Sequence, residues 1–311
     1  MPSRLFASQL AAKVEGTEGA VEALTATELV LCSKVDYKPS QNTYNRDVMR
    51  GSLSRSPGIG GLQSAKISCS VELRGSGTAG VAPDYATLLK GCGFGVVPTP
   101  AQTPTSVVIS PITTAIPSLT IGAYFDGVLH KIIGARGTVK CSIESGKPGR
   151  LDFEFTGVGI DTSDVGLLDA AGYDDVVPPA FISAAFLVDS YAAIISKLDW
   201  DIANTVTLRE SINSASGYLS ALITGRNPKG SLDPELPLVA SYDFFTNWKT
   251  NGVGALTIAA GVTAGNIVTI TMPVIRYANI NPGDRGGIRT LGIDFEMCCD
   301  DSDDEISLVI T

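Results

Sequence analysis

Short apolar runs separated by turn residues dominate the hydrophobic pattern of the chain. Between Leu119 and Val158, runs of Val, Ile, Leu, Tyr and Phe are interrupted by Asp126–Gly127, by single glycines and by the turn Ser145–Gly149. Such runs, rich in β-branched and aromatic residues and bounded by turn formers, are typical of strands. The pattern predicts a meander of antiparallel strands.

A second stretch, Gly265–Met297, repeats this arrangement. Ile267, Thr269 and Thr271 occupy alternate positions, which places them on one face of a strand, and we expect the turn at Asn281–Asp284. The chain therefore contains two predicted meanders.

A short helix is predicted before each meander. Ala82–Gly93, with the helix near residues 83–91, and Ala240–Gly252 each begin at a polar cap and end at glycine. Helices this short are unstable alone, so we expect each to pack on a sheet face.

The similarity between the two halves extends to four blocks in the same order. Ser33–Tyr37 resembles Ser196–Trp200, and at the same spacing of 163 residues Glu72-Leu73 resembles Glu235-Leu236. The two helical segments form the second block. The third and fourth blocks pair Ser118–Gly127 with Ala255–Gly265 and Gly149–Gly157 with Leu291–Met297. A repeat of this kind indicates an internal duplication.

The repeat predicts two domains, residues 1–175 and 176–311, divided in the turn-rich segment Ala170–Pro179. The first domain includes an N-terminal arm. It also contains the Pro- and Thr-rich segment Val96–Pro117, which we expect to be an extended surface connection. The fold prediction is mainly β, with two tandem antiparallel β sandwiches or open barrels, each with a short flanking helix and a long loop.

Composition narrows the classes of function. The 311 residues carry a formal net charge of -9, which argues against a surface that grips nucleic acid through its phosphates. His130 is the single histidine, so one chain cannot supply a zinc site with paired imidazoles. The six cysteines form no CxxC motif and are expected to be reduced. The most apolar segment, Pro178–Val188, is too short to span a bilayer, and no membrane binding is expected.

Motifs that could carry chemistry are weak. His130 lies in a predicted strand, and no GxSxG motif supplies a nucleophile. The glycine cluster Gly91–Gly95 follows a helix rather than a strand, and Ser145–Gly149 lacks the rest of a phosphate-binding loop. The acidic segment Cys298–Val309 lacks the glycine and alternating ligands of a calcium loop, which favours a solvated turn between two strands. We predict no catalytic residue, cofactor or metal site.

Two long polar segments, Ser40–Ala65 and Ile202–Gly230, lie between predicted strands where a compact domain would have a short turn. One reading is a disordered loop. Their retained apolar residues favour arms that order on a neighbouring subunit. The candidate contact residues are Arg46, Met49, Arg50, Leu53, Arg55, Arg209, Ile212, Leu219 and Arg226.

Several segments together resemble the tail tube proteins of tailed bacteriophages, in particular those of long non-contractile tails. The segments are Lys13–Ala20, Arg50–Gly77, Ala82–Phe94, Phe125–Gly157 and Gly225–Glu235. The resemblance implies a structural virion protein, located in the tail and assembled in the host cytoplasm. In such tubes, rings of six domains stack around a tape-measure protein and later conduct the DNA during ejection, without binding it specifically.

By this resemblance the two arms are candidates for contacts between rings. The strands expected to curve around the lumen lie in Gly137–Ile143, Asp152–Thr156, Ile267–Met272 and Ile293–Met297. Two tube domains per chain favour a homotrimeric ring with pseudo-sixfold symmetry, and a homohexamer is the alternative. Six domains with four strands each, spaced about 4.8 Å apart, give a backbone diameter near 37 Å and a bore of about 25 Å, wide enough for a DNA duplex.

Two other classes of function remain open from the sequence. One is another β-rich part of the virion tail, such as a distal tail, terminator or decoration protein. The other is a carbohydrate-binding or hydrolytic β sandwich, for which exposed aromatic platforms or paired acids are expected. Trp200 and Trp248 both lie inside repeat blocks, which favours packing roles for both.

Overall fold

The computed structural model describes residues 7–49, 51–99, 104–159, 162–169, 173 and 176–311. The fold is mainly β, with antiparallel strands and two short α-helices, as the sequence predicts. The predicted domain boundary near residue 175 falls outside the described residues. Within those residues, no helix combines the length and the apolar character that crossing a membrane requires.

The first half of the chain forms a set of six strands. Their spatial order is β1-β7-β8-β9-β4-β3, and every neighbouring pair is antiparallel. In chain order the six are β1 (Ser8–Val14), β3 (Lys34–Tyr44), β4 (Ile59–Glu72), β7 (Leu119–Phe125), β8 (Val128–Glu144) and β9 (Arg150–Gly159).

The second half forms another set of six. Its order is β11-β16-β17-β18-β15-β12, again antiparallel throughout. The strands are β11 (Ala185–Val188), β12 (Lys197–Asp201), β15 (Lys229–Leu232), β16 (Val253–Ala260), β17 (Val268–Arg285) and β18 (Ile288–Cys298). Each strand stands at the place of one strand of the first set. The sequence blocks that resemble each other fall on equivalent strands or helices, except that Glu72 ends β4 whereas Glu235-Leu236 lies beyond the end of β15.

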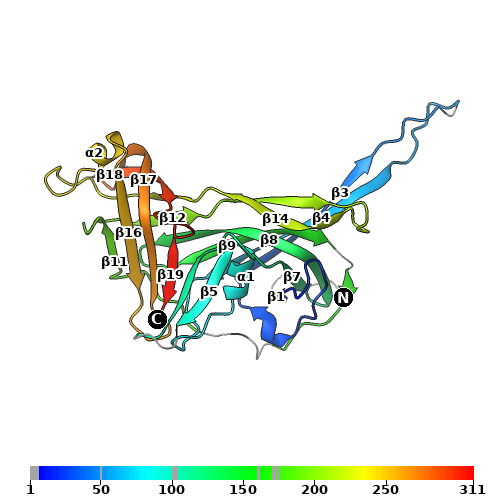
Figure 1. Cartoon of the computed structure of the whole chain (residues 1–311), viewed down its shortest axis with the longest axis horizontal. Helices are drawn as coiled ribbons and strands as arrows, with labels where there is room; N and C mark the ends of the chain where they lie inside the picture. Colours follow the sequence, from blue (N-terminus) through cyan, green and yellow to red (C-terminus); the bar gives the residue numbers. More distant parts are fainter. Residues whose placement is uncertain (1–6, 50, 100–103, 160–161, 170–172, 174–175) are drawn as a thin grey trace.

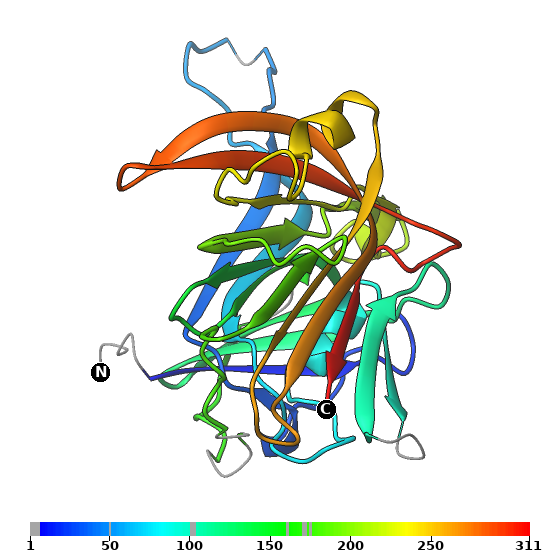
Figure 2. The same ribbon diagram turned by 90° about the vertical axis from the view of Figure 1, so that its left-hand side faces the viewer.

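The two sets are joined edge to edge. Lys197–Asp201 of β12 pairs with Lys140–Glu144 of β8, on the side of β8 opposite β9. The result is a continuous run of eight strands, β3-β4-β9-β8-β12-β15-β18-β17, which we call the eight-strand run. In Figure 1 it extends from the β3–β4 hairpin on one side of the molecule to the β17–β18 hairpin on the other. Figure 2 shows the tips of both hairpins projecting beyond the body.

Seven further strands complete the described part of the fold. They are β2 (Leu29–Val30), β5 (Phe94–Thr99), β6 (Ser106–Pro111), β10 (Ser163–Asp164), β13 (Asn204–Glu210), β14 (Tyr218–Arg226) and β19 (Ser307–Ile310), with a 3-10 turn, η1, at Ala26–Glu28. β10 pairs with the start of β8, and β2 with β1. β13 and β14 form a separate two-stranded hairpin.

The segment Val96–Pro117 is not the extended surface connection that the sequence suggested. Most of it forms the β5–β6 hairpin, and β6 pairs with β19 from the far end of the chain. Val107 and Ile109 are buried in this contact. The prediction was wrong because the partner strand lies about 200 residues away, where local composition gives no sign of it.

The helices lie where the repeat places them but are shorter than the predicted segments. α1 (Ala86–Gly91) buries Leu88 and Leu89 in the core and contacts β1, β5 and β8. α2 (Phe244–Lys249) begins at Asp243, whose carboxylate accepts a hydrogen bond from the Thr246 backbone N–H at 3.0 Å, and it packs on β17. Each helix covers the equivalent sheet in its own half.

The buried apolar residues form one main cluster that passes through both halves. It contains Phe153 and Phe155 of β9, Trp200 of β12 and Phe295 of β18. Because the cluster crosses the β8–β12 joint, we expect the two halves to resist sliding or separating at that joint.

Candidate assembly surface

One face of the eight-strand run packs on the core, and the other is polar. Along β9, Leu151, Phe153 and Phe155 are buried, whereas Asp152 and Glu154 point to the opposite face. This alternation follows from the period of two in a strand. The polar face therefore combines side chains from strands of both halves.

Charges of opposite sign alternate across this polar face. One row of directly paired residues crosses all eight strands, running Lys34, Ser70, Asp152, Lys140, Asp201, Lys229, Glu296, Arg276. Within the row, Lys140 Nζ lies 3.2 Å from Asp201 Oδ2, and Arg276 pairs with Glu296. Opposite charges on neighbouring strands stabilise the pairing and leave few uncompensated positive charges.

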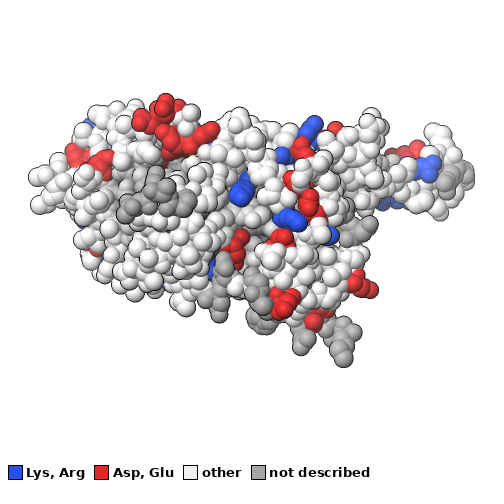
Figure 3. Space-filling model, turned by 60° about the horizontal axis from the view of Figure 1, so that its bottom comes forward, with Lys and Arg blue, Asp and Glu red and all other residues white. Residues whose placement is uncertain are grey.

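Acidic groups are also conspicuous elsewhere on the surface. On the face drawn in Figure 3, red acidic groups form several small clusters, blue basic groups are scattered among them, and most of the surface is uncharged. This agrees with the net charge of -9. A face of this kind attracts no polyanion strongly.

The eight-strand run has two free ends. At one end, β3 pairs only with β4 among the described strands. At the other end, β16 and β19 pair only with the first part of β17. The later part, Asn279–Arg285, pairs with β18 on one edge and has no partner on its other edge within the described chain. Asn279, Asn281 and Gly283 are exposed there. Open sheet edges of this kind are templates for pairing with another chain.

The turn at this second end lies later in the chain than the sequence predicts. Asn281–Asp284 belongs to β17, and the turn consists of Gly286 and Gly287, whose φ angles of 62° and 90° suit a two-residue hairpin turn. Pro282 is tolerated in the strand because its nitrogen faces the edge without a neighbour. The Gly-Gly pair between two β-rich runs was the signal that could have located the turn.

The first predicted arm is a β-hairpin that leaves the body of the molecule. β3 and β4 remain paired out to Tyr44 and Ile59, and residues 45–49 and 51–58 lie in the tip (Figure 1). Met49 and Leu53 in the tip are 105% and 108% exposed, which is unusual for large apolar side chains. We call the described residues 45–49 and 51–58 the arm tip.

The basic candidates in the arm tip have few contacts. Arg46 is exposed, and Arg55 donates a hydrogen bond to the Asn45 side chain within the tip. Arg50 falls outside the described residues. The arm tip therefore presents apolar and basic side chains together, away from the rest of its own chain.

The second predicted arm behaves differently. The β13–β14 hairpin lies along β8 and β9 of the first half, with Ser220 and Ala221 fully buried. Arg136 Nη1 donates to the Ala221 carbonyl at 2.5 Å, and the Gln63 N–H donates to the Ser216 carbonyl at 2.9 Å. Gly134 makes the approach possible, because a Cβ there would lie 2.9 Å from the Ser220 Cα.

Arg209 of this hairpin is tied to the first half through Glu18. Its guanidinium lies 3.6 Å from the Glu18 carboxylate, which also accepts hydrogen bonds from Arg136 at 2.8 Å and from Ser220 at 2.7 Å. Burial raises the pKa of Glu18, but these hydrogen bonds and the two arginine charges outweigh it, so the pKa lies below its ordinary value. The carboxylate is therefore ionised at neutral pH and helps to hold the hairpin in place.

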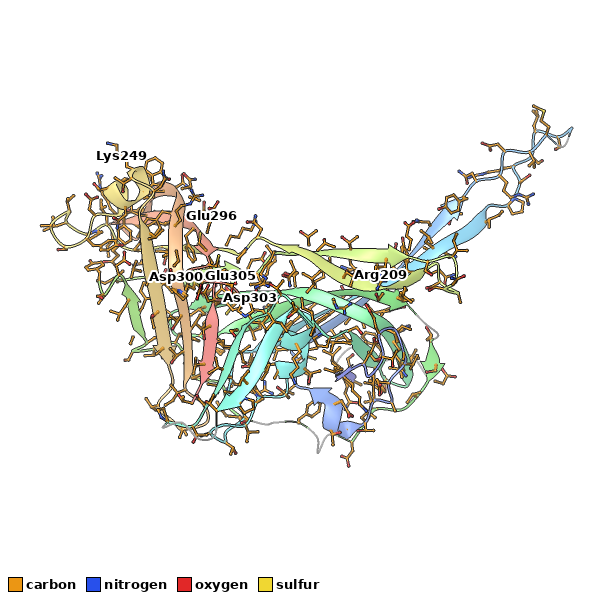
Figure 4. The ribbon with its side chains drawn as sticks, viewed as in Figure 1. Arg209, Lys249, Glu296, Asp300, Asp303 and Glu305 are labelled. Atoms are coloured by element: carbon orange, nitrogen blue, oxygen red, sulfur yellow. The ribbon has the colours of Figure 1, made fainter. Side chains whose placement is uncertain are left out.

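Arg226, at the base of the hairpin, connects three parts of the chain. Its guanidinium lies 3.2 Å from Glu305 and 3.3 Å from Asp303, and it donates to the Ile112 carbonyl at 3.0 Å. Figure 4 shows Asp303 and Glu305 close together below β14. Of the apolar candidates, Leu219 is partly exposed and Ile212, at the hairpin tip, is fully exposed.

The acidic segment before β19 is a turn between two strands, as predicted, and two of its carboxylates bind Arg226. Among the described residues, no group of three or more His, Cys, Asp or Glu side chains could hold a metal ion. His130 stacks on Tyr37 with ring centroids 4.5 Å apart, and burial lowers its pKa, so it is neutral at neutral pH. This histidine has a packing role.

Comparison with known proteins agrees with a structural role for this surface. The family model for phage tail tube proteins matches residues 6–297, nearly the whole chain. A search of curated proteins found no match. Proteins of the matched family are structural and not enzymatic, they belong to the virion tail, and they generally self-assemble into a tube. The chain therefore belongs to the phage tail tube protein family.

Proposed function

We propose that the chain is a tube subunit in which each half acts as one tube domain, so that three chains build a ring of six similar units. The observation that carries this proposal is the repeated strand order, β1-β7-β8-β9-β4-β3 and β11-β16-β17-β18-β15-β12. A homohexamer of the same chain would contain twelve units and remains the alternative. The predicted division into residues 1–175 and 176–311 is part of this proposal.

The eight-strand run accounts for the inner wall of such a ring. Each half contributes four strands to this wall, so three copies supply 24 strands. At a spacing of about 4.8 Å between strands, 24 strands enclose a bore of about 25 Å. Neighbouring strands alternate in direction along the run, so its two end strands point in opposite directions. A second copy can therefore continue the sheet antiparallel, and three copies can close it into a barrel.

This wall uses three of the four strand ranges expected at the lumen, in β8, β9 and β18. Val268–Met272 instead lies in the part of β17 that pairs with β16 and β19, so we assign the later part of β17 to the wall. The polar face of the run then lines the bore. Its alternating charges would let DNA pass during ejection without being held. The bore would hold a tape-measure protein during assembly in the host cytoplasm.

We assign stacking of the rings to the two arms. In the arm tip the proposed contacts are Arg46, Met49, Arg50, Leu53 and Arg55, and in the second hairpin they are Arg209, Ile212, Leu219 and Arg226. Met49, Leu53 and Ile212 are the strongest candidates, because burying a fully exposed apolar side chain against the next ring contributes about 1.5–3 kcal/mol each. Arg209 and Arg226 already have partners within their own chain and would act by shaping the hairpin.

Electron microscopy and native mass measurement of the purified protein test the proposal. We expect stacked rings with a central channel, each containing three chains of 32.4 kDa. Six chains per ring would select the homohexamer. A protein that stays monomeric at high concentration, with and without its tape-measure protein, would contradict the assignment of ring formation to this chain.

A further inference from the structure

The two elements that break the repeat between the halves contact each other. In the first half the β5–β6 hairpin lies between α1 and β7, whereas in the second half α2 ends at Lys249 and β16 begins at Val253. β19 follows β18 as β10 follows β9, but β10 has two residues, both exposed, and β19 has four. Because β6 pairs with β19, the hairpin that only the first half has is joined to the strand that is longer in the second half.

β19 is paired on both edges, and its two partners belong to different halves. On one edge Ser307–Ile310 pairs with Val268–Thr271 of β17, and on the other edge most of the strand pairs with Val107–Ile109 of β6. The Thr311 N–H continues the contact by donating to the Ile267 carbonyl at 3.0 Å. The place that β19 occupies therefore exists only when both halves are folded and lie side by side.

One face of β19 is buried between the halves. Leu308 and Ile310 are 3% and 2% exposed, and Ile306, just before the strand, is 1% exposed. Ser307 and Val309 alternate with them and point to the half-exposed face. A strand of four residues has no stability of its own, so this apolar burial is what holds it in place.

The turn before β19 is fastened to the first half by polar contacts. The carboxylate of Asp303 accepts hydrogen bonds from the backbone N–H of Thr113, at 3.1 Å, and from its hydroxyl, directly after β6. Arg226 donates to the Ile112 carbonyl at 3.0 Å and lies 3.2 Å from the Glu305 carboxylate. These contacts align the turn with the end of β6, so that β19 enters its place in one register.

Glycines bring the backbones of the two halves together beside the end of β19. The Gly77 N–H donates to the Gly265 carbonyl at 3.1 Å, and the Gly75 N–H donates to the Asn266 side chain at 2.8 Å. A Cβ on Gly265 would lie 2.5 Å from the Gly77 carbonyl carbon. Because the Gly265 N–H donates to the Thr311 carbonyl at 2.9 Å, this contact is continuous with β19.

The contacts of β19 lie apart from the β8–β12 joint. In Figure 1, β12 is near the top of the molecule, and β19 runs below it toward the lower edge. A joint between two strand edges leaves the halves free to rock about the line of the joint, and a second contact away from that line removes this freedom.

We propose that residues 299–310, the turn and β19 together, act as a latch that docks after both halves have folded and fixes the angle between them. Docking comes late because β19 pairs with a strand about 200 residues earlier in the chain, and such distant contacts form slowly. The consequence for assembly rests on the proposed ring. Three copies close a ring of six units more readily when the angle within each chain is set in advance.

Hydrogen exchange of full-length variants tests the latch without requiring rings. Leu308→Asp combined with Ile310→Asp places two carboxylates on the buried face and should undock β19. Exchange in residues 106–111 and 307–310 should then accelerate at least tenfold, while β7, β9 and β18 keep their protection. The matched control is Val309→Asp, on the half-exposed face of the same strand, which should change exchange less than twofold. Faster exchange throughout the second half, or none in β6, would overturn the latch.

A milder variant with a removable covalent bond separates undocking from misfolding. Leu308→Ala combined with Ile310→Ala should weaken docking without introducing charge. Adding Val108→Cys and Val309→Cys allows a disulfide between half-exposed residues that are directly paired, with Cα atoms about 4.5–5.5 Å apart. Oxidation should restore the protection of β6, and a reductant should remove it again. Protection that does not return on oxidation would contradict the latch.

Ring formation by the same variants, measured by electron microscopy and native mass, tests the consequence for assembly. At equal concentration Leu308→Asp with Ile310→Asp should give at least tenfold fewer rings than the unmodified chain, and Val309→Asp should give as many. Equal numbers of rings in all three would refute the link between the latch and the ring. An unmodified chain that forms no rings would contradict the proposed function, whereas selective exchange in β6 would still support the latch.

Discussion

Gly134 is the position at which a single methyl group should loosen the second hairpin. Its φ of 58° lies in the left-handed region, and a Cβ would lie 2.9 Å from both the Cα and the Cβ of Ser220. Alanine at Gly134 therefore combines backbone strain with a collision against the buried part of β14. The contacts at risk include the hydrogen bond from Arg136 to the Ala221 carbonyl.

The two contributions can be separated by a matched control. Gly286 has a φ of 62°, and a Cβ there meets nothing within 4 Å. Gly286→Ala should cost about 1–2 kcal/mol, which is the backbone strain alone. Gly134→Ala should cost this amount plus about 1–3 kcal/mol for overpacking against Ser220.

Urea unfolding of the two variants measures this difference, and hydrogen exchange of residues 204–226 locates it. Exchange in the β13–β14 hairpin should accelerate in Gly134→Ala and stay unchanged in Gly286→Ala. The reasoning would be refuted if Gly134→Ala were no less stable than Gly286→Ala, or if the hairpin kept its protection.

Three further predictions concern the arms and the charges that hold them. Because the pKa of Glu18 is lowered in the folded chain, its contribution to stability is present above its unfolded pKa and is lost as the pH falls through the lower folded value. Glu18→Gln should therefore reduce the melting temperature at pH 7, and the difference from the unmodified chain should shrink as the pH falls through these two pKa values. Arg226→Ala leaves the Asp303 and Glu305 carboxylates without their cation and should lower the free energy of unfolding in urea by about 1–3 kcal/mol. Arg209 is more exposed, so Arg209→Ala should cost less, and an equal loss of stability in both variants would contradict this reasoning. Replacing Met49 and Leu53 by serine should change stability by less than about 0.5 kcal/mol yet prevent rings from stacking, and normal tubes in electron micrographs would count against the arm-tip assignment.

Local sequence signals were sufficient for the repeated elements. The alternation in Gly149–Gly157 and Leu291–Met297 predicts strands, and both segments lie in or overlap equivalent strands, β9 and β18. The two short helices likewise lie within the predicted segments, although only α2 has the predicted side-chain cap, at Asp243. These features depend on side-chain periodicity and capping, which act over a few residues.

Features that depend on distant partners were not predictable in the same way. Val107 and Ile109 occur in a segment rich in proline and threonine, and only pairing with β19 makes that segment a buried strand. Pro282 suggested a turn, and only the absence of a described neighbour on its side of β17 explains why it is compatible with a strand.

The candidate assembly surface likewise combines features that the local sequence predicts with features that depend on distant partners. Apolar residues retained in the polar segment Ser40–Ala65 indicated an arm, and the structure has a projecting hairpin there. The matching segment Ile202–Gly230 has a similar composition, yet its hairpin lies on the first half of its own chain, because Gly134 and Arg136 provide a place for it. Composition does not distinguish an arm that is already seated from one that is free.

The order of residues along the chain predicted a β protein with two similar halves, because strand periodicity and the spacing of matching blocks are properties of the sequence alone. Which edges are joined and which stay open was decided only in three dimensions. β12 and β3 occupy equivalent positions in the two halves, but only the edge of β12 is covered. β12 pairs with β8 of the same chain, whereas β3 pairs with no second strand in the described part of a single copy. Edge pairing depends on what lies alongside a folded strand, and that is determined by the arrangement of both halves.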